Sequence, residues 1–167
     1  MLALAWLVFC MGQALADNLV ERGAYLTRAA GCMGCHTDRA GKGAPFAGGR
    51  ALKTPFGIFY SPNITAHKQT GIGAWSDGDF LAAVKQGIRP DGAHYFPVFP
   101  YTSYTLLRAE DALAIKAYLF SLTPVARQNR AHDVGPPFSW RWSMGAWKQL
   151  YFDAGEFIAD DKQDAQW

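Results

Sequence analysis

The stretch AAGCMGCHTD, residues 29–38, places Cys32 and Cys35 three positions apart and His36 directly after the second cysteine. The chain has one more cysteine, Cys10, which lies in an apolar N-terminal segment. In an oxidising compartment two neighbouring cysteines usually form a disulfide. A disulfide would leave the adjacent histidine unexplained, so the three residues require a common interpretation.

Two thiols and a histidine at this spacing are the attachment signature of haem c. Each thiol can add to one vinyl group of the porphyrin, and the histidine then points at the iron as its proximal ligand. A zinc site would need a second ligand pair, and the chain has no further cysteine after residue 35. A thioredoxin-like pair would need a βαβ context, of which the sequence shows no sign. We therefore predict one covalent haem c held by Cys32, Cys35 and His36, with His36 on the iron.

The first sixteen residues have the pattern of a secretory signal peptide. The apolar run LALAWLVF, residues 2–9, is too short to span a bilayer. It is followed by the small-x-small sequence ALA at residues 14–16, which is typical of a cleavage site. The segment lacks the usual Lys or Arg at its start, so an uncleaved anchor is the alternative. We expect cleavage, loss of Cys10, and a periplasmic protein that either is free or associates with the membrane.

The composition is that of a single globular domain. The chain has 167 residues, of which half are hydrophobic and 14% are aromatic. Such a chain can bury a core without further cross-links. Its formal net charge is only +2, whereas a nucleic-acid binder would be expected to carry a basic stripe. We therefore expect no nucleic-acid partner.

Periodicity and end signals predict a mostly α-helical chain. The expected helices span residues 18–31, 76–90 and 108–122. Gly23 weakens the first helix and is expected to permit the close approach of another element. Ser76 is a suitable N-cap for the second helix, and Pro90 is expected to end it. Residues 37–74 predict loops, with a short hairpin in TPFGIFYSPNIT, residues 54–65.

The order of first helix, attachment motif, loop, middle helix, ligand loop and final helix resembles a class I cytochrome c. More narrowly, four segments resemble the cytochrome c subunits of periplasmic alcohol, aldehyde and sugar dehydrogenases. They are GGRALKTPFGIFYSPNIT, TGIGAWSDGDF, FPVFPYTSYT and AYLFSLTPV, which begin at residues 48, 70, 96 and 117. After the signal peptide (1–16), the resemblance implies a cytochrome c domain (17–126) around one haem, followed by an aromatic-rich C-terminal tail (127–167).

The resemblance also implies roles for individual residues around the haem. Gly23 and Tyr25 would pack against the last helix of the domain. Trp75 would lie at the haem edge, with its N–H within reach of a propionate, although an ordinary core tryptophan is the alternative. Arg50 is a second candidate partner for a propionate, and the alternative is a solvated loop arginine.

The sharpest departure from the related subunits lies in the ligand loop. There the loop usually reads Tyr-Pro-Ala-Met-Pro-Tyr, and its methionine is the distal iron ligand. Here residues 96–101 read FPVFPY, so that Phe99, which cannot bind iron, takes the methionine position. Three outcomes stay open: five-coordinate iron beneath Phe99, ligation by His94, or ligation by Met144. The weaker candidates are two histidines in polar loops, His67 and His132.

These features predict an electron carrier rather than an enzyme. Electrons would arrive from a periplasmic dehydrogenase and leave toward another cytochrome or a terminal oxidase of the respiratory chain. The alternative is a haem protein that binds or senses small ligands at an open distal site. A third interpretation concerns WRWSMGAWKQLYF, residues 140–152, whose aromatic area either folds back over the domain or docks onto a larger enzyme or a membrane surface.

Overall fold

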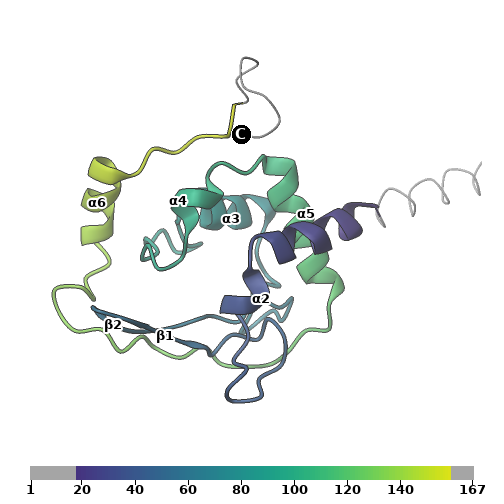
Figure 1. Ribbon diagram of the computed structural model, residues 1–167, viewed down its shortest axis with the longest axis horizontal. Helices are drawn as coiled ribbons and strands as arrows, with labels where there is room; N and C mark the ends of the chain where they lie inside the picture. Colours follow the sequence, from purple (N-terminus) through teal and green to yellow (C-terminus); the bar gives the residue numbers. More distant parts are fainter. Residues whose placement is uncertain (1–17, 159–167) are drawn as a thin grey trace, which may run out of the picture.

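The computed structural model describes residues 18–158. The expected signal peptide and the last residues of the tail lie outside this range. After a first helix at 18–29, the elements are α2 (Cys32–Cys35), β1 (Ala51–Thr54), β2 (Gly57–Tyr60), α3 (Asp77–Leu81), η1 (Ala82–Gln86), α4 (Tyr101–Tyr104), α5 (Ala109–Ser121) and α6 (Ser143–Tyr151) (Figure 1). Helices are thus the main regular structure, as expected.

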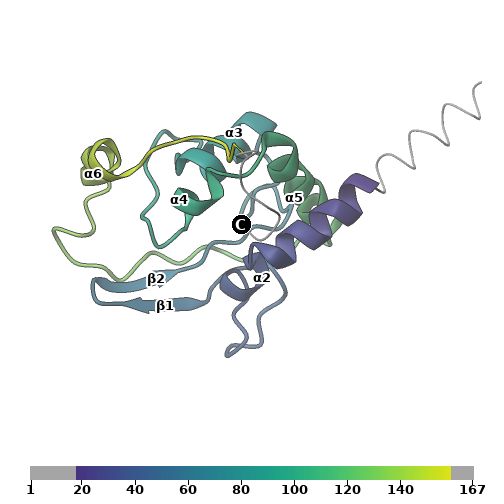
Figure 2. The ribbon, with the colours of Figure 1, turned by 45° about the horizontal axis from the view of Figure 1, so that its top comes forward.

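The two strands form the expected hairpin. β1 and β2 pair in antiparallel fashion, with Ala51 opposite Tyr60 and Thr54 opposite Gly57. Figure 2 shows the hairpin beneath a layer that contains α3, α4 and α6. The prediction of a hairpin is confirmed, although it spans residues 51–60 and so begins before the predicted stretch 54–65. No helix occurs between residues 37 and 74.

The first helix crosses α5 at close range (Figures 1 and 2). A Cβ at Gly23 would lie 1.9 Å from the carbonyl oxygen of Ala114 and 2.9 Å from the Cβ of Tyr118. The prediction that Gly23 permits a close approach is therefore confirmed. Tyr25 keeps 64% of its surface exposed, so its expected packing against the last helix was wrong. Two positions along a helix rotate a side chain by roughly 200°, which takes Tyr25 away from this crossing.

The core joins the loop after the attachment motif to α3 and α5. Its buried members are Phe46, Ile72, Phe80, Ala112, Ile115 and Leu119. The last three of these lie on one face of α5, as the helical spacing predicts. Burial of this face fixes α5 as the element against which the rest of the chain packs.

The second predicted helix begins as expected but ends earlier. Ser76 is the N-cap: its hydroxyl accepts from the backbone N–H of Asp79, while the Asp79 carboxylate accepts from the backbone N–H of Ser76. The helix continues as the π-helical turn η1 and ends at Gly87, which has a left-handed φ of 62°. The expected end at Pro90 was wrong, because Gly87 adopts the left-handed conformation that ends helices and its N–H donates to the carbonyls of Ala82 and Ala83.

Two helices were not predicted. α4 begins at the last residue of the ligand loop FPVFPY, residues 96–101, and α6 lies in the C-terminal tail. In both views α4 separates α6 from α5 (Figures 1 and 2). Within residues 18–158, none of the helices has the length and apolar character that crossing a bilayer requires.

The extended segment 122–134 runs back along the loops of the first half. The backbone N–H of Asn63 donates to the side-chain oxygen of Asn129 at 2.7 Å. The guanidinium of Arg127 forms an ion pair with Asp38 at 3.1 Å. These contacts tie the start of the tail to the domain.

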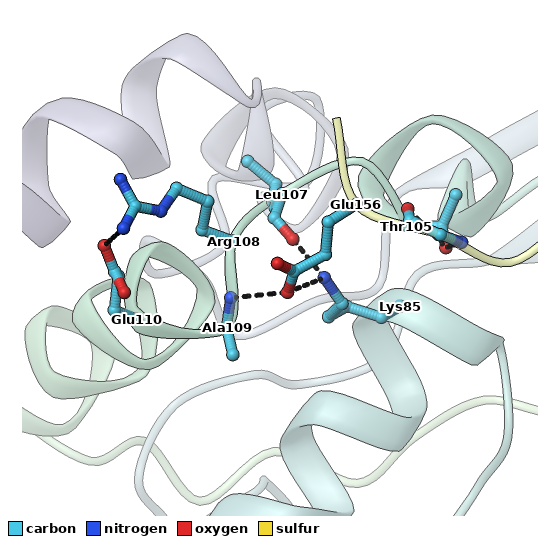
Figure 3. A network of polar contacts seen from close by, with 8 residues as sticks. Lys85, Thr105, Leu107, Arg108, Ala109, Glu110 and Glu156 are labelled. Atoms are coloured by element: carbon cyan, nitrogen blue, oxygen red, sulfur yellow. Dashed lines mark hydrogen bonds and ion pairs between the residues drawn. The ribbon is translucent and has the colours of Figure 1, made fainter. Parts of the chain in front are cut away.

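The end of the described chain is fastened to α5 and η1 (Figure 3). Glu156 accepts from Lys85 Nζ at 3.0 Å and from the backbone N–H of Ala109 at 3.2 Å. Lys85 also donates to the carbonyl of Leu107, and the N–H of Phe157 donates to Leu106 at 3.1 Å. Residues 127–157 therefore lie against the domain at both ends.

Candidate haem site

α2 is a single helical turn that carries both cysteines of the attachment motif. Cys32 is partly buried, Cys35 is exposed, and neither forms a disulfide. The backbone N–H of His36 donates to the carbonyl of Cys32 and closes the turn. The two thiols and the imidazole therefore leave the backbone from consecutive turns, as attachment of one porphyrin through two thioethers requires.

His36 is oriented by a residue far away in the sequence. Its Nδ1 lies 2.8 Å from the carbonyl oxygen of Pro62. Because a carbonyl can only accept, Nδ1 carries the proton and Nε2 keeps its lone pair. Burial lowers the pKa of His36, which also favours the neutral ring. Imidazoles that bind metals are usually held in this way through their second nitrogen, so the site fits a haem iron at Nε2.

Asn63 fixes the loop that presents the Pro62 carbonyl. This asparagine is only 2% exposed. Its amide donates to the carbonyl of Val125 at 2.7 Å, and its side-chain oxygen accepts from the backbone N–H of Thr65 at 2.9 Å and from the Thr65 hydroxyl at 2.8 Å. Sequence reasoning missed this residue, although an asparagine directly after proline in the turn SPNIT, residues 61–65, was a signal that could have been used.

Tyr104 of α4 contacts the chain just before the attachment motif. Its hydroxyl donates to the carbonyl of Ala30 at 2.6 Å. Burial, together with the nearby Cys32 and Cys35, raises the pKa of Tyr104 to about 12. Burial also raises the pKa of the Cys32 thiol to about 11. Sequence reasoning missed Tyr104, because only the fold brings α4 next to α2.

Phe99 packs against Tyr104, the residue that contacts the stretch just before the attachment motif. Its ring is half-buried, with its centroid 5.8 Å from that of Tyr104 and 5.4 Å from that of Tyr95. Through Tyr104 the structure therefore brings Phe99 toward the two cysteines. The arrangement fits an aromatic cover, since no atom of the Phe99 side chain can bind a metal.

The two candidate propionate partners occupy different settings. Trp75 is partly buried against the core, and its carbonyl accepts from Lys116 at 2.9 Å. Arg50 is exposed and donates from its guanidinium to the carbonyl of Gly34, between the two cysteines. Arg50 and Asp38 also line one side of a surface groove beside α2. Both Trp75 and Arg50 stay predictions as propionate partners.

His94 faces the C-terminal part of the chain. Its Nδ1 accepts from Lys148 Nζ at 3.1 Å, and a Cβ at Gly145 would lie 3.1 Å from its Nε2. Its carbonyl accepts from the guanidinium of Arg141 at 3.0 Å. Both ring nitrogens of His94 are therefore directed at α6.

The other two histidines are engaged elsewhere. The Nδ1 of His132 accepts from the backbone N–H of Tyr60 at 3.2 Å, and its ring packs against Phe59 and Phe96 at 5.1 and 5.9 Å between centroids. The Nδ1 of His67 accepts from the backbone N–H of Thr70 at 3.2 Å. Neither histidine is brought together with the attachment motif by these contacts.

The match to a known family agrees with this geometry. The model of the cytochrome c family matches residues 20–123, which include α2, Pro62, Phe99 and α5. The chain belongs to the cytochrome c family. Membership implies a covalently bound haem c, and the residues of this cytochrome c fit the group at Cys32, Cys35 and His36.

Relatives of this cytochrome c include subunits of several dehydrogenases. The chain is 42% identical to a nicotinate dehydrogenase subunit of Pseudomonas putida, over 89% of the chain and 12% of the relative. It is 43% identical to the gluconate 2-dehydrogenase cytochrome c subunit of Pantoea cypripedii (81% of the chain, 30% of the relative). It is 41% identical to the cytochrome c subunit of the quinone alcohol dehydrogenase of Gluconobacter oxydans (81% and 28%). The chain thus spans less than a third of these curated relatives.

Proposed function

We propose that this cytochrome c carries single electrons from a dehydrogenase toward the respiratory chain, with one haem c in the chain described here. The observation that carries the proposal is the orientation of His36, whose Nδ1 bond to Pro62 leaves Nε2 available for iron. A bound haem c supplies an iron that cycles between the ferric and ferrous states. The protein itself needs no substrate chemistry for this role.

The position of the attachment motif suits transfer to a partner. Cys35 is exposed, so the thioether attached to it would lie at the molecular surface. Electron carriers use small, transient contacts, because turnover requires rapid release of the partner. A motif near the surface supports such a contact better than a buried one.

The proposed location is the periplasm. The signal-like pattern of residues 1–16 supports export. Covalent attachment would retain the haem in a compartment from which a loosely bound cofactor could be lost.

The proposed electron donor is a periplasmic dehydrogenase, and the acceptor is another cytochrome or a terminal oxidase. The proposal of the donor rests on the three relatives, whose names describe dehydrogenase subunits. Trp140 and Trp142 are 47% and 72% exposed and stack with 6.0 Å between centroids. Stacked, exposed indoles are typical of contact surfaces, so we propose this pair as the part of the tail that touches the donor.

The cofactor is tested on protein exported by a host that matures c-type cytochromes. We expect the intact mass to include one haem and the pigment to stay with the chain in acid acetone. The double variant Cys32→Ala, Cys35→Ala should lose both properties, while the matched control His67→Gln should keep them. Pigment that extracts freely from the wild type would refute the proposal.

The electron-transfer role is tested by stopped-flow mixing with purified sugar or alcohol dehydrogenase and its substrate. Rapid reduction of the haem, followed by reoxidation on adding a terminal oxidase preparation, is expected. Trp142→Ala should slow the first step if the indole pair contacts the donor, and the exposed substitution Gln69→Ala should not. Haem that stays oxidised with every dehydrogenase tested would contradict the role.

A second candidate function is favoured by Phe99. This residue packs on Tyr104, which bonds to Ala30 just before the attachment motif, but it cannot bind iron. An open distal site would therefore admit small ligands such as nitric oxide or carbon monoxide. Fast, tight binding of carbon monoxide by the ferrous protein would favour a ligand-binding or sensing role. A closed six-coordinate spectrum would favour the electron carrier.

A further inference from the structure

The loop that supplies the distal ligand in related subunits offers no donor at the expected position. Phe99 occupies that position, and its ring is surrounded by Tyr95, Tyr101 and Tyr104. A reversible electron carrier benefits from a closed coordination sphere, because a change in ligation adds to the reorganisation that each electron must overcome. A distal donor would therefore have to come from another element.

The histidine nearest in sequence is committed to α6. His94 receives a hydrogen bond from Lys148 at Nδ1, and Gly145 lies against its Nε2. To reach an iron, the ring would have to break its hydrogen bond with Lys148. The buried ammonium would then lose one of its acceptors, which costs free energy. His94 thus serves to seat α6 rather than to bind metal.

α6 is held firmly on the segment that surrounds Phe99. Lys148 is buried and donates to the carbonyls of Gln86 and Gly87 at 2.5 and 2.8 Å. Just before α6, the guanidinium of Arg141 lies 4.4 Å from the centroid of the Phe96 ring. The face of α6 that carries Lys148 therefore points into the domain. Lys148 contacts Gln86, which precedes the ligand loop, and Arg141 contacts Phe96, the first residue of that loop.

Met144 lies on this same face. It precedes Lys148 by four residues and adjoins Gly145, so its side chain projects from the side of α6 that packs on the domain. Met144 is half-buried. Of the methionines within residues 18–158, the other is Met33, which lies between the two cysteines in α2 and is 37% exposed. Met33 belongs to the turn that bears the proximal histidine, so it cannot reach the opposite face.

We propose that Met144 of α6 is the distal ligand and that its thioether sulfur binds the haem iron on the face opposite His36. The inference rests on the proposed function, since it requires a bound haem c. A thioether is neutral and does not have to lose a proton before it binds iron. Together with histidine it forms the ligand pair that raises the reduction potential in cytochromes c. Phe99 then lines the distal side, and the tail helix contributes the donor that the loop lacks.

The first test is the near-infrared absorption of the purified ferric holoprotein. Methionine-ligated ferric haem shows a weak sulfur-to-iron charge-transfer band there, and we expect the wild type to show it. Met144→Leu should abolish the band, lower the reduction potential, and let the ferrous protein bind carbon monoxide. The control Leu150→Ala, at a position of α6 that is 74% exposed, should leave all three properties unchanged. A band that persists in Met144→Leu would overturn the assignment.

A second measurement does not depend on the variant folding. In the ferrous protein, the methyl group of a ligating methionine is strongly shifted by the ring current of the haem, so NMR of methyl-labelled methionine is expected to show one such signal in the wild type and in Met33→Leu. Its absence from the wild type would overturn the assignment. A covalent haem without a methionine signature refutes the role of Met144 alone, whereas haem that dissociates in acid acetone refutes the proposed function as well.

Discussion

The backbone of Gly23 lies directly against the carbonyl group of Ala114, where a Cβ would come within 1.9 Å of the oxygen. Gly23→Ala must therefore separate the first helix from α5, and overpacking of this kind costs about 1–3 kcal/mol. Urea denaturation of the holoprotein should show this loss of stability. Gly135→Ala is the matched control, because a Cβ at Gly135 meets no atom within 4 Å. Equal stability of the two variants would contradict the close crossing.

Asn63 should be among the most sensitive polar residues of the domain. Asn63→Ala removes hydrogen bonds to Thr65 and Val125 and leaves buried partners unsatisfied, which costs about 1–3 kcal/mol for each group. Because the backbone of residue 63 adjoins the Pro62 carbonyl, the same change should loosen the hold on His36. Denaturation should show the loss, and the haem spectrum should broaden or shift. The exposed substitution Gln69→Ala should do neither.

The capping box at the start of α3 gives a smaller and more local effect. Ser76→Ala removes the hydroxyl that accepts from the N–H of Asp79 at 3.1 Å, and the loss of such an N-cap costs about 1 kcal/mol. Thermal unfolding should show a lowered Tm with an unchanged haem spectrum. Ser103→Ala, on an exposed position of α4, is the control. A Tm shift as large for Ser103→Ala as for Ser76→Ala would argue against a specific cap.

Mild acid should weaken the docking of α6 through His94. Burial, and then the charge of Lys148, lower the pKa of His94 below its ordinary value of 6.5. Between that lowered pKa and 6.5, the unfolded chain binds a proton that the folded chain does not, so stability falls as the pH decreases through this window. Above 6.5 the contribution is fully present. The charged group that faces the ring is Lys148, and its positive charge disfavours protonation of His94.

The measurement is the free energy of unfolding at about pH 7.5 and about pH 5 for the wild type and for His94→Gln. We expect the variant to lose less stability on acidification than the wild type. His67→Gln serves as a control for the removal of a histidine from a loop. An identical pH dependence in wild type and His94→Gln would show that His94 does not report on this contact.

The sequence predicted the elements that depend on local rules. The first helix, the hairpin, the start of α3 and the inward face of α5 follow from periodicity, turn residues and an N-cap, which act within a few residues. The end of the middle helix was placed at Pro90, although Gly87 is a local C-cap signal that ends the helix three residues earlier. α4 and α6 were missed since each is short and is held by contacts with other parts of the chain.

The residues of the candidate site also fall into two groups, those that the sequence reveals and those that only the fold reveals. Cys32, Cys35 and His36 are recognisable because their spacing alone sets the geometry of attachment. Pro62, Asn63 and Tyr104 were not recognised, since their part in the site depends on bonds to residues that are distant in the sequence. The orientation of His94 toward α6 was equally invisible before the fold was known.

By itself, the sequence determined the family, the motif on which the prediction of an attached haem rests, and the absence of a methionine at residue 99, because each of these is written in neighbouring residues. Only the tertiary structure decided which tautomer His36 adopts, which side chains surround Phe99 and which face of α6 meets the domain. The physical reason is that a covalent link needs only two thiols at a fixed spacing, whereas hydrogen bonds and packing across a site require the chain to bring remote residues within a few ångströms.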